Sequence, residues 1–315
     1  MAGLAEIDVL VHEVGPRDGL QATDVIMPTE GKLAWIRAMK EAGLSKIQAG
    51  SFVPPKLLPQ MADSAEVVAG AKKMGGFYVS ALVPNLKGAE NALAAGADQL
   101  NFVMSASEEH NLKNVRKTHE QSLEDFAKIV AYRNSDPRFS HVSVSGGLAT
   151  CFGCTIAGRI EPKIVFSLVD KLIEAGADRI GIADTVGYAN PAQVRDVFST
   201  IKSQVDGLDV GAHFHDTRGL GLANAYAALE AGVRELDSCL GGLGGCPYAP
   251  GATGNIVTED LVFMLESMGL KTGIDLDRLL VARDVMKSYL GDEETHGHFV
   301  KAGPPKGFVP ASKAA

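Results

Sequence analysis

Short apolar runs alternate with longer segments whose apolar residues recur at helical spacing along most of this chain. Runs of four to nine residues, rich in Val, Ile and Ala, are typical of buried strands, and a three-to-four-residue apolar period is typical of amphipathic helices. The strands predicted in this way are residues 7–14, 46–52, 77–83, 99–104, 141–149, 179–183, 209–214 and 235–238. Helices are predicted between them, for example at 29–42, 162–175 and 191–205, where the prolines at 162 and 191 suit a first helical turn.

A short phrase containing Ala-Gly recurs where a predicted helix gives way to a predicted strand. Its glycines are Gly43, Gly96, Gly176 and Gly232. A glycine at this place can take the left-handed conformation that ends a helix. The spacing of these glycines corresponds to roughly 27 residues per strand–helix unit, with one insertion between the second and third.

Eight strands alternating with helices predict a TIM (β/α)8 barrel, with a doubly wound open sheet as the main alternative. We expect one catalytic barrel over residues 1–272, since barrels of this kind commonly use 250 residues or more. Residues 273–315 are expected to form a C-terminal extension. It contains a helical segment at 275–289 and a tail at 301–315 that is rich in Pro, Gly and Lys and is expected to be mobile.

Composition narrows the classes of partner. The formal net charge is -8, and no run of clustered Lys and Arg is present, so a nucleic-acid-binding surface is not expected. No stretch approaches the ~18 consecutive apolar residues of a membrane span. The first strand begins almost at once, which leaves no room for a signal peptide. We therefore expect a soluble, cytoplasmic protein whose four cysteines are reduced.

A metal site is indicated by two histidines on one predicted strand. His213 and His215 are two residues apart, so their side chains point to the same side of the strand. Asp18 follows the first strand, and Asn255 follows the last one. In a closed barrel these three strands are neighbours, and their carboxyl ends share one rim. Two oxygen and two nitrogen ligands favour Mg²⁺ or Mn²⁺ over zinc.

Each of these residues also has a purely structural interpretation. Strand histidines can be held by side chains of the barrel without binding a metal. His296 and His298 have the same spacing, but they lie near the tail without a strand around them, so surface chemistry is expected there.

Three further residues are candidates for catalysis. Arg17 is permanently charged and can stabilise a developing enolate oxygen, although a rim ion pair is the alternative. Cys246 lies in a glycine-rich loop that could bring its thiol to a substrate, unless it is an inert loop cysteine. Asp184 and the adjacent Thr185 follow the sixth strand and could bind substrate or position Arg17, whereas capping of a helix is the alternative for Asp184.

The chain resembles the 3-hydroxy-3-methylglutaryl-CoA lyase family over about residues 11–270. The resemblance is carried by five segments, which are Glu13–Gln21, Ser51–Val53, Val83–Gly88, His213–Thr217 and Gly242–Ala249, together with Gly254-Asn255 and Thr258–Leu261. It implies a TIM barrel that cleaves a branched 3-hydroxyacyl-CoA with Mg²⁺ or Mn²⁺. It also implies the residue roles. By position, the metal ligands would be Asp18, His213, His215 and Asn255, the enolate would be stabilised by Arg17, and the loop thiol for proton transfer would be Cys246.

The chain also departs from the family pattern. Gln48 stands where family members commonly carry Glu, which removes a carboxylate expected near Arg17. A neutral amide can still accept a hydrogen bond from the guanidinium but cannot pair with its charge. The segment 151–156 lacks the usual Cys-Pro-Tyr. Because such positions surround the acyl group in the family, we expect Gln48, Ser51 and Thr185 near the acyl substrate.

The leading function is a metal-dependent retro-aldol lyase that releases acetyl-CoA and a keto acid such as acetoacetate. A close alternative changes the substrate to citramalyl-CoA or a related 3-hydroxyacyl-CoA. A second class is a condensing synthase of the isopropylmalate or homocitrate type, and a third is a binding protein that Gln48 has made catalytically silent. The candidates for binding the CoA phosphates are Asn85, Lys87, Lys113 and Asn114, although such lysines are often merely solvated. A homodimer is expected.

Overall fold

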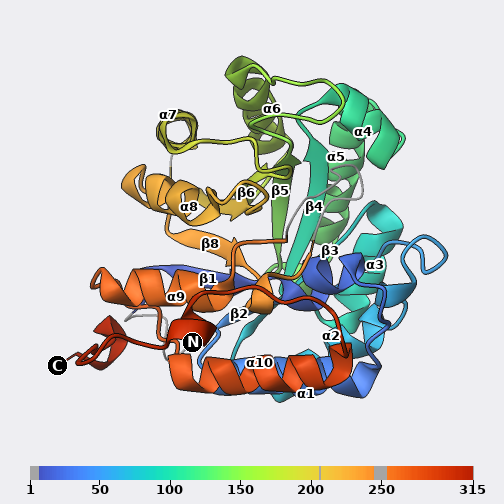
Figure 1. Cartoon of the computed structure of the whole chain (residues 1–315). Coiled ribbons are helices and arrows are strands. Elements are labelled where there is room, and N and C mark those ends of the chain that lie inside the picture. Colours follow the sequence, from blue (N-terminus) through green and yellow to red (C-terminus); the bar gives the residue numbers. More distant parts are fainter. Residues whose placement is uncertain (1–6, 206, 245–253, 315) are drawn as a thin grey trace.

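Eight parallel strands close into a barrel in sequence order, with β8 pairing back onto β1 (Figure 1). The computed structural model describes residues 7–205, 207–244 and 254–314. The strands are β1 Leu10–Glu13, β2 Lys46–Ser51, β3 Tyr78–Leu82, β4 Gln99–Ser105, β5 Ser143–Ala149, β6 Arg179–Asp184, β7 Asp209–Phe214 and β8 Glu235–Ser238. The predicted TIM barrel is confirmed, and the open doubly wound sheet is excluded because β1 and β8 are hydrogen-bonded neighbours.

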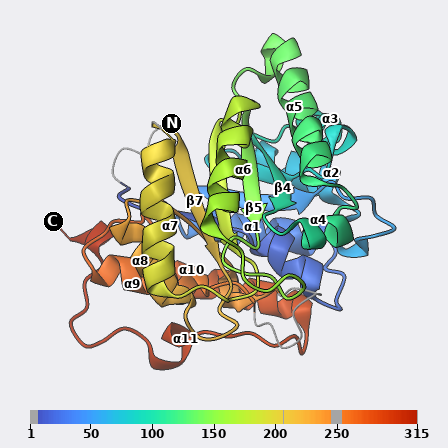
Figure 2. The ribbon, with the colours of Figure 1, turned by 90° about the horizontal axis from the view of Figure 1, so that it is seen from above.

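Helices surround the barrel and alternate with its strands (Figures 1 and 2). They are α1 Thr29–Glu41, α2 Ser64–Met74, α3 Leu86–Ala95, α4 Glu108–Asn114, α5 His119–Ser135, α6 Pro162–Glu174, α7 Pro191–Gln204, α8 Gly221–Glu230, α9 Thr258–Ser267, α10 Leu276–Leu290 and α11 Phe299–Ala302. Their inward faces pack on the strands through buried residues such as Trp35, Phe126 and Phe198. This is the layered core that the apolar pattern predicts.

The predicted boundaries of the strands and helices are close to the observed ones. The recurring glycines mark the ends of four helices, which makes those boundaries predictable. Gly43, Gly96, Gly176 and Gly232 all have positive φ, which is the conformation that a helix C-terminus needs. At Gly43 an added Cβ would lie 2.3 Å from the backbone oxygen of Gly273, so both conformation and space require glycine there. The fifth strand starts at Ser143 rather than 141, because Val142 closes a turn with Phe139.

The interior of the barrel at the amino ends of its strands is charged rather than apolar. Lys46 is 3% exposed, and its Nζ donates to Glu235 Oε1 at 2.7 Å and to Gln99 Oε1 at 2.9 Å. Arg179 also pairs with Glu235. Burial, opposed by these two cations, leaves the pKa of the Glu235 carboxyl below its ordinary value. The polar layer is therefore internally neutralised.

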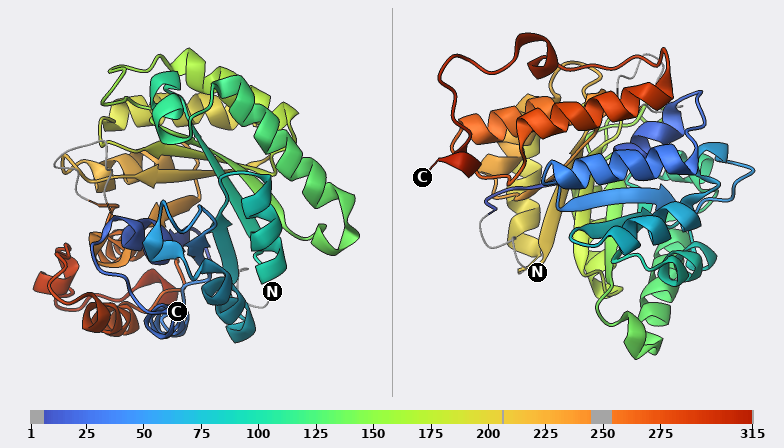
Figure 3. Two further views of the ribbon diagram at one scale, coloured as in Figure 1. Left: turned by 90° about the vertical axis from the view of Figure 1, so that its right-hand side faces the viewer. Right: turned by 90° about the horizontal axis from the view of Figure 1, so that it is seen from below.

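The C-terminal extension lies against the barrel's helical layer. Helix α10 packs beside α1, as the right-hand view of Figure 3 shows. Arg283 of α10 pairs with the fully buried Glu259 of α9 and donates to the backbone oxygen of His296 at 2.8 Å. In the tail, the Ser312 amide and hydroxyl both donate to Glu266. Mobility of the tail stays a prediction. Within the described residues, no helix is both long and apolar enough to cross a membrane.

Candidate metal centre and active site

Three strand ends bring the predicted metal ligands together. Directly after β1, a buried single turn, Gly15–Gly19, carries Arg17 and Asp18. Strand β7 carries His213, and His215 follows its last residue. His215 also pairs through an isolated bridge with Asn255, which lies between β8 and α9. Residues from 18 to 255 thus meet at one point of the barrel rim, as the sequence predicts.

The ligand atoms have the spacing of a coordination site. Nε2 of His213 lies 3.1 Å from Nε2 of His215, and Asp18 Oδ2 lies 3.9 Å and 3.7 Å from these two nitrogens. The Asn255 side-chain amide donates to the same Asp18 oxygen at 2.8 Å. Neighbouring ligands of an octahedral cation with bonds of about 2.1 Å lie about 3 Å apart. The distances between these ligand atoms are therefore equal to or somewhat longer than those around a bound ion, and one ion could contact all of them.

Two buried atoms of the site point to an additional binding partner. Asn255 Oδ1 and His215 Nδ1 are buried, and no hydrogen-bond partner for them is found among the described residues. Leaving such an atom unsatisfied costs about 1–3 kcal/mol. An amide oxygen is a ligand that a hard divalent cation accepts. The orphaned Asn255 oxygen, one carboxylate and two imidazoles therefore fit Mg²⁺ or Mn²⁺.

The charges around the site keep Asp18 ionised. Burial by itself raises the pKa of the Asp18 carboxyl, but the adjacent Arg17 guanidinium and the two histidines outweigh it, so the pKa lies well below its ordinary value. Burial lowers the pKa of His213, while its hydrogen bond to Asp237 and the Asp18 charge overcome that effect and raise it. An ionised carboxylate beside two imidazoles is suited to a cation.

Arg17 is held by two side chains. Its Nε donates to Gln48 Oε1, and its Nη1 donates to Asp18 Oδ1. Only 8% of Arg17 is exposed, so its charge is largely desolvated. The contact expected between residue 48 and Arg17 is confirmed, with an amide in place of a carboxylate.

Asp184 has a structural role in its described contacts. It is fully buried, and its two oxygens accept hydrogen bonds from the amides of Tyr188 at 2.8 Å and Ala189 at 2.9 Å. Burial, the largest effect, raises its pKa. Asp184 therefore holds the turn after β6, but it does not cap the next helix, because the N-cap of α7 is Asn190. The described hydrogen bonds of Arg17 go to Gln48 and Asp18, and a catalytic or substrate-binding role of Asp184 stays a prediction.

The other expected acyl-site residues are also tied to the scaffold. Thr185 Oγ1 accepts a hydrogen bond from the Thr150 amide at 2.8 Å, which joins the loops after β5 and β6. Ser51 is 1% exposed, and its amide donates to Ser64 Oγ at 3.0 Å. Cys246 lies outside the described residues.

The four residues expected to bind CoA phosphates follow β3 and β4. Asn85 caps α3 by accepting a hydrogen bond from the Gly88 amide at 3.0 Å. Lys87 is exposed and pairs with Glu90 at 3.0 Å. Lys113 and Asn114 are exposed at the end of α4.

Sequence reasoning missed two carboxylates beside the site, the half-buried Asp237 and the fully buried Glu13. Asp237 Oδ2 accepts from His213 Nδ1 at 3.1 Å. Glu13 accepts from the amides of Gly15 and Leu240 and from the Thr258 hydroxyl. The available signal was their place on short strands beside the predicted metal ligands. The strand pattern alone does not separate such acids from the solvated residues at strand ends.

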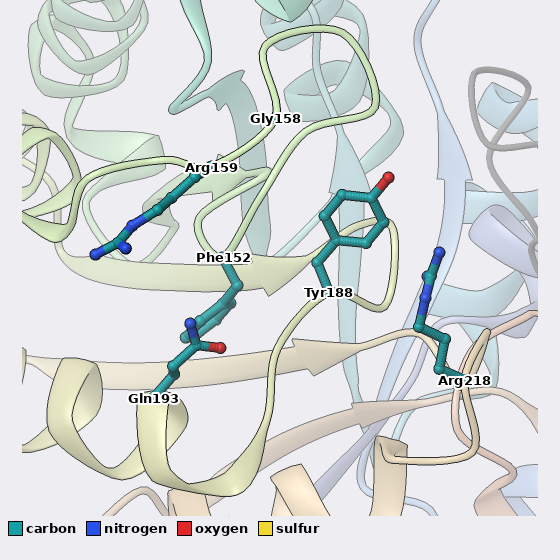
Figure 4. Close-up of a pocket in the computed structure, with 6 residues that line it drawn as sticks. All are labelled: Phe152, Gly158, Arg159, Tyr188, Gln193 and Arg218. Atoms are coloured by element: carbon teal, nitrogen blue, oxygen red, sulfur yellow. The ribbon is translucent and has the colours of Figure 1, made fainter.

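A pocket opens at the same rim, on the loops after β5, β6 and β7 (Figure 4). It is lined by Phe152, Gly158, Arg159, Tyr188, Gln193 and Arg218. The Arg218 guanidinium lies 4.6 Å from the centre of the Tyr188 ring and donates to the backbone oxygens of Val186 at 2.9 Å and Gly187 at 3.2 Å. Arg218 follows His215 by three residues in the sequence.

Comparison with known proteins gives consistent matches over most of the chain. A family model described as HMGL-like matches residues 8–286. The chain is 41% identical over 283 residues to the hydroxymethylglutaryl-CoA lyase YngG of Bacillus subtilis, covering 90% of this chain and 93% of that protein. It is 44% identical over 274 residues to the mitochondrial hydroxymethylglutaryl-CoA lyase of Macaca fascicularis, covering 87% and 83%. A solved HMG-CoA lyase from Acinetobacter baumannii, in complex with coenzyme A and 3-methylmalate, superposes with a TM-score of 0.89 at 43% identity, covering 98% of this chain and 99% of that one.

Proposed function

Because the chain belongs to the HMGL-like family of carbon–carbon lyases, we propose that it cleaves 3-hydroxy-3-methylglutaryl-CoA to acetyl-CoA and acetoacetate. The single observation that carries this proposal is the convergence of Asp18, His213, His215 and Asn255 at one rim of a barrel that is 41–44% identical to such lyases. The same comparisons favour a lyase over a condensing synthase of the isopropylmalate type.

The reaction breaks the bond between C2 and C3 of the acyl chain. The 3-hydroxyl group loses its proton, its oxygen becomes the ketone of acetoacetate, and the electron pair of the broken bond moves to the thioester as an enolate. A proton added at C2 then completes acetyl-CoA. Atoms and charge balance without an oxidant or a further substrate.

Residues of this chain are candidates for holding the metal, for stabilising the enolate and for delivering the proton at C2. Asp18, His213, His215 and Asn255 would hold a Mg²⁺ or Mn²⁺ ion. Such an ion, when bound, lowers the pKa of an alcohol and polarises a carbonyl oxygen. Arg17 supports the enolate, since a desolvated guanidinium stabilises developing negative charge. Gln48 orients Arg17 by accepting a hydrogen bond from the Arg17 Nε–H group. We assign protonation at C2 to the Cys246 thiol.

The CoA portion requires positive charge near the rim. We propose Lys87, Lys113, Asn85 and Asn114 as one group of CoA contacts. Of the two lysines, Lys113 is exposed at the end of α4 and Lys87 is paired with Glu90, while Asn85 caps α3. The solved relative with coenzyme A bound supports an acyl-CoA substrate. We also propose a homodimer, which sedimentation would test, and a cytoplasmic location, which cell fractionation would test.

A different acyl chain is the second candidate. Two observations favour it: the amide of Gln48 beside Arg17, and the 3-methylmalate bound in the solved relative. The decisive experiment incubates the protein and Mg²⁺ or Mn²⁺ with HMG-CoA, citramalyl-CoA and the CoA thioester of 3-methylmalate, with chelator controls. We expect acetyl-CoA and acetoacetate from HMG-CoA. If only another thioester were turned over, that thioester would be the substrate in place of HMG-CoA. Release of free CoA from acetyl-CoA and a 2-oxo acid would indicate a synthase.

The roles are separated by two variants. His215→Ala is expected to weaken both Mn²⁺ binding and turnover, since it removes a ligand atom. Cys246→Ala is expected to lower kcat by about 100-fold or more while metal binding stays near the unsubstituted level. Metal titration and product assays check both. Wild-type turnover in either variant would contradict the assigned role of that residue.

A further inference from the structure

A chain of buried and half-buried polar side chains runs through the barrel interior to the candidate metal centre. His12 on β1 and His213 on β7 are both register partners of Asp237 on β8. Side chains at matching positions of neighbouring parallel strands project to the same side of the sheet. Register alone therefore places these three side chains in contact, although 225 residues separate His12 from Asp237.

The Asp237 carboxylate bridges the two imidazoles. Its Oδ2 lies 3.1 Å from His213 Nδ1, and its Oδ1 lies 2.8 Å from His12 Nδ1. A carboxylate only accepts hydrogen bonds, so each histidine carries its proton on Nδ1. The Nε2 of His213 then keeps its lone pair, and this is the atom that faces His215 and Asp18. A histidine that binds a metal through Nε2 needs this tautomer.

At the end of this series of contacts that is remote from the metal centre, His12 contacts Ser80. His12 is 2% exposed, and its Nε2 lies 2.8 Å from Ser80 Oγ, so both ring nitrogens are engaged. Glu235 lies 3.9 Å from His12 Nδ1 but is already paired with Lys46 and Arg179. His12, Glu235 and Asp237 together resemble a cation site in composition. Lys46 and Arg179 already balance the negative charge of Glu235. We therefore interpret this cluster as a support for the candidate metal centre and not as a second metal site.

We propose that Asp237 is a positioning residue that fixes His213 in the Nδ1-protonated tautomer with Nε2 directed at the metal, and that His12 acts on the same centre through Asp237. The inference rests on the proposed metal role of His213. It goes beyond the four ligands, because it assigns part of the metal affinity to residues that do not touch the ion.

The first test measures Mn²⁺ affinity by the loss of the free-ion paramagnetic resonance signal. Asp237→Ala is expected to weaken Mn²⁺ binding by about 10- to 100-fold, which is typical of losing the carboxylate behind a metal-bound histidine. Asp237→Asn keeps one acceptor oxygen for two imidazoles, so an intermediate loss is expected, and this variant preserves side-chain volume if the alanine variant does not fold. Asp237→Ala affinity equal to that of the unsubstituted protein would overturn the assignment.

A double-substitution cycle tests the route through Asp237. His12→Leu alone is expected to weaken binding several-fold, and to have no further effect when added to Asp237→Ala. Independent, additive losses would show that His12 does not act through Asp237. Glu235→Gln is the matched control: it removes a buried charge from the same polar layer and is expected to lower stability while leaving Mn²⁺ affinity within about threefold. If Glu235→Gln weakened Mn²⁺ binding as much as Asp237→Ala does, the effect of Asp237 would be a general structural one and the assignment would fail.

A second readout needs no metal and no turnover. With ¹⁵N-labelled histidine, the metal-free protein is expected to show His213 protonated on Nδ1, and His213→Asn identifies its resonances. Asp237→Ala is expected to shift His213 toward the Nε2-protonated form. An Nε2-protonated His213 in the unsubstituted protein would overturn the inference. Failure of the unsubstituted protein to bind Mn²⁺, with the expected tautomer present, would instead count against the proposed metal role.

Discussion

Gln48 makes the most consequential single contact at the residue scale, because it holds the charge proposed to stabilise the enolate. Replacing it with Leu leaves the Nε–H group of buried Arg17 without its acceptor. An unsatisfied buried donor costs about 1–3 kcal/mol, so Gln48→Leu is expected to lower kcat by about 10- to 100-fold. Steady-state kinetics with HMG-CoA would measure this, and Mn²⁺ affinity is expected to change little.

Gln48→Glu is the matched control for that prediction. It retains an acceptor at the same place and adds a charge that can pair with Arg17. Activity is therefore expected to survive in the Glu variant and to fall in the Leu variant. Equal losses in both would mean that the amide has a role other than orienting Arg17.

At the scale of elements, Glu13 joins the end of β1 to the start of the segment after β8. Its carboxylate accepts from the Gly15 amide at 2.8 Å, the Leu240 amide at 3.0 Å and the Thr258 hydroxyl at 2.7 Å. Burial raises the pKa of Glu13 to about 7 from an ordinary 4.5, although these hydrogen bonds oppose the rise. The turn that carries Arg17 and Asp18 is thus anchored by a group that titrates near neutrality.

This shift predicts a pH dependence of stability. Between pH 4.5 and about 7 the native protein holds a proton on Glu13 that the unfolded chain releases, so the free energy of unfolding falls as pH rises through that window. The fall attributable to Glu13 is at most about 3 kcal/mol. Glu13→Gln does not titrate, and urea unfolding across the window is expected to show a correspondingly shallower slope for this variant. Identical slopes for the two proteins would contradict the prediction.

At the scale of the whole molecule, a buried ion pair between Arg283 and Glu259 joins the extension to the barrel. Arg283 is 4% exposed, and its partner Glu259 is fully buried, with Gly241 also donating to the Glu259 carboxylate at 3.1 Å. Removing one partner of a buried pair costs about 3–5 kcal/mol. Arg283→Met is therefore expected to lower the free energy of unfolding by that amount, measured by urea denaturation.

An exposed ion pair in the same extension provides the comparison. Lys313 Nζ lies 2.9 Å from Asp275 Oδ2 at the surface. Such an exposed pair contributes less than about 1 kcal/mol to the free energy of unfolding. Lys313→Ala is expected to change stability little. Because α10 packs on α1, both variants are expected to unfold in one transition. Separate transitions for barrel and extension would show that residues 273–315 fold independently.

Local signals account for what the sequence determined by itself. Periodic apolar residues and the glycines at 43, 96, 176 and 232 located the strands and helices, since helix caps and strand alternation depend on neighbours along the chain. The same locality placed Asp18 and His213 at strand ends, which predicted a shared site once the strands were assumed to close.

Only the tertiary structure decided what depends on register and burial. Hydrogen bonding of β8 to β1 closes the barrel, and the same register sets Asp237 between His12 and His213. The hydrogen bonds that Asp184 accepts from the amides of Tyr188 and Ala189 likewise depend on the folded turn after β6. A buried charge is stable only with its partners around it, and those partners come from strands whose alignment no single segment of the chain contains.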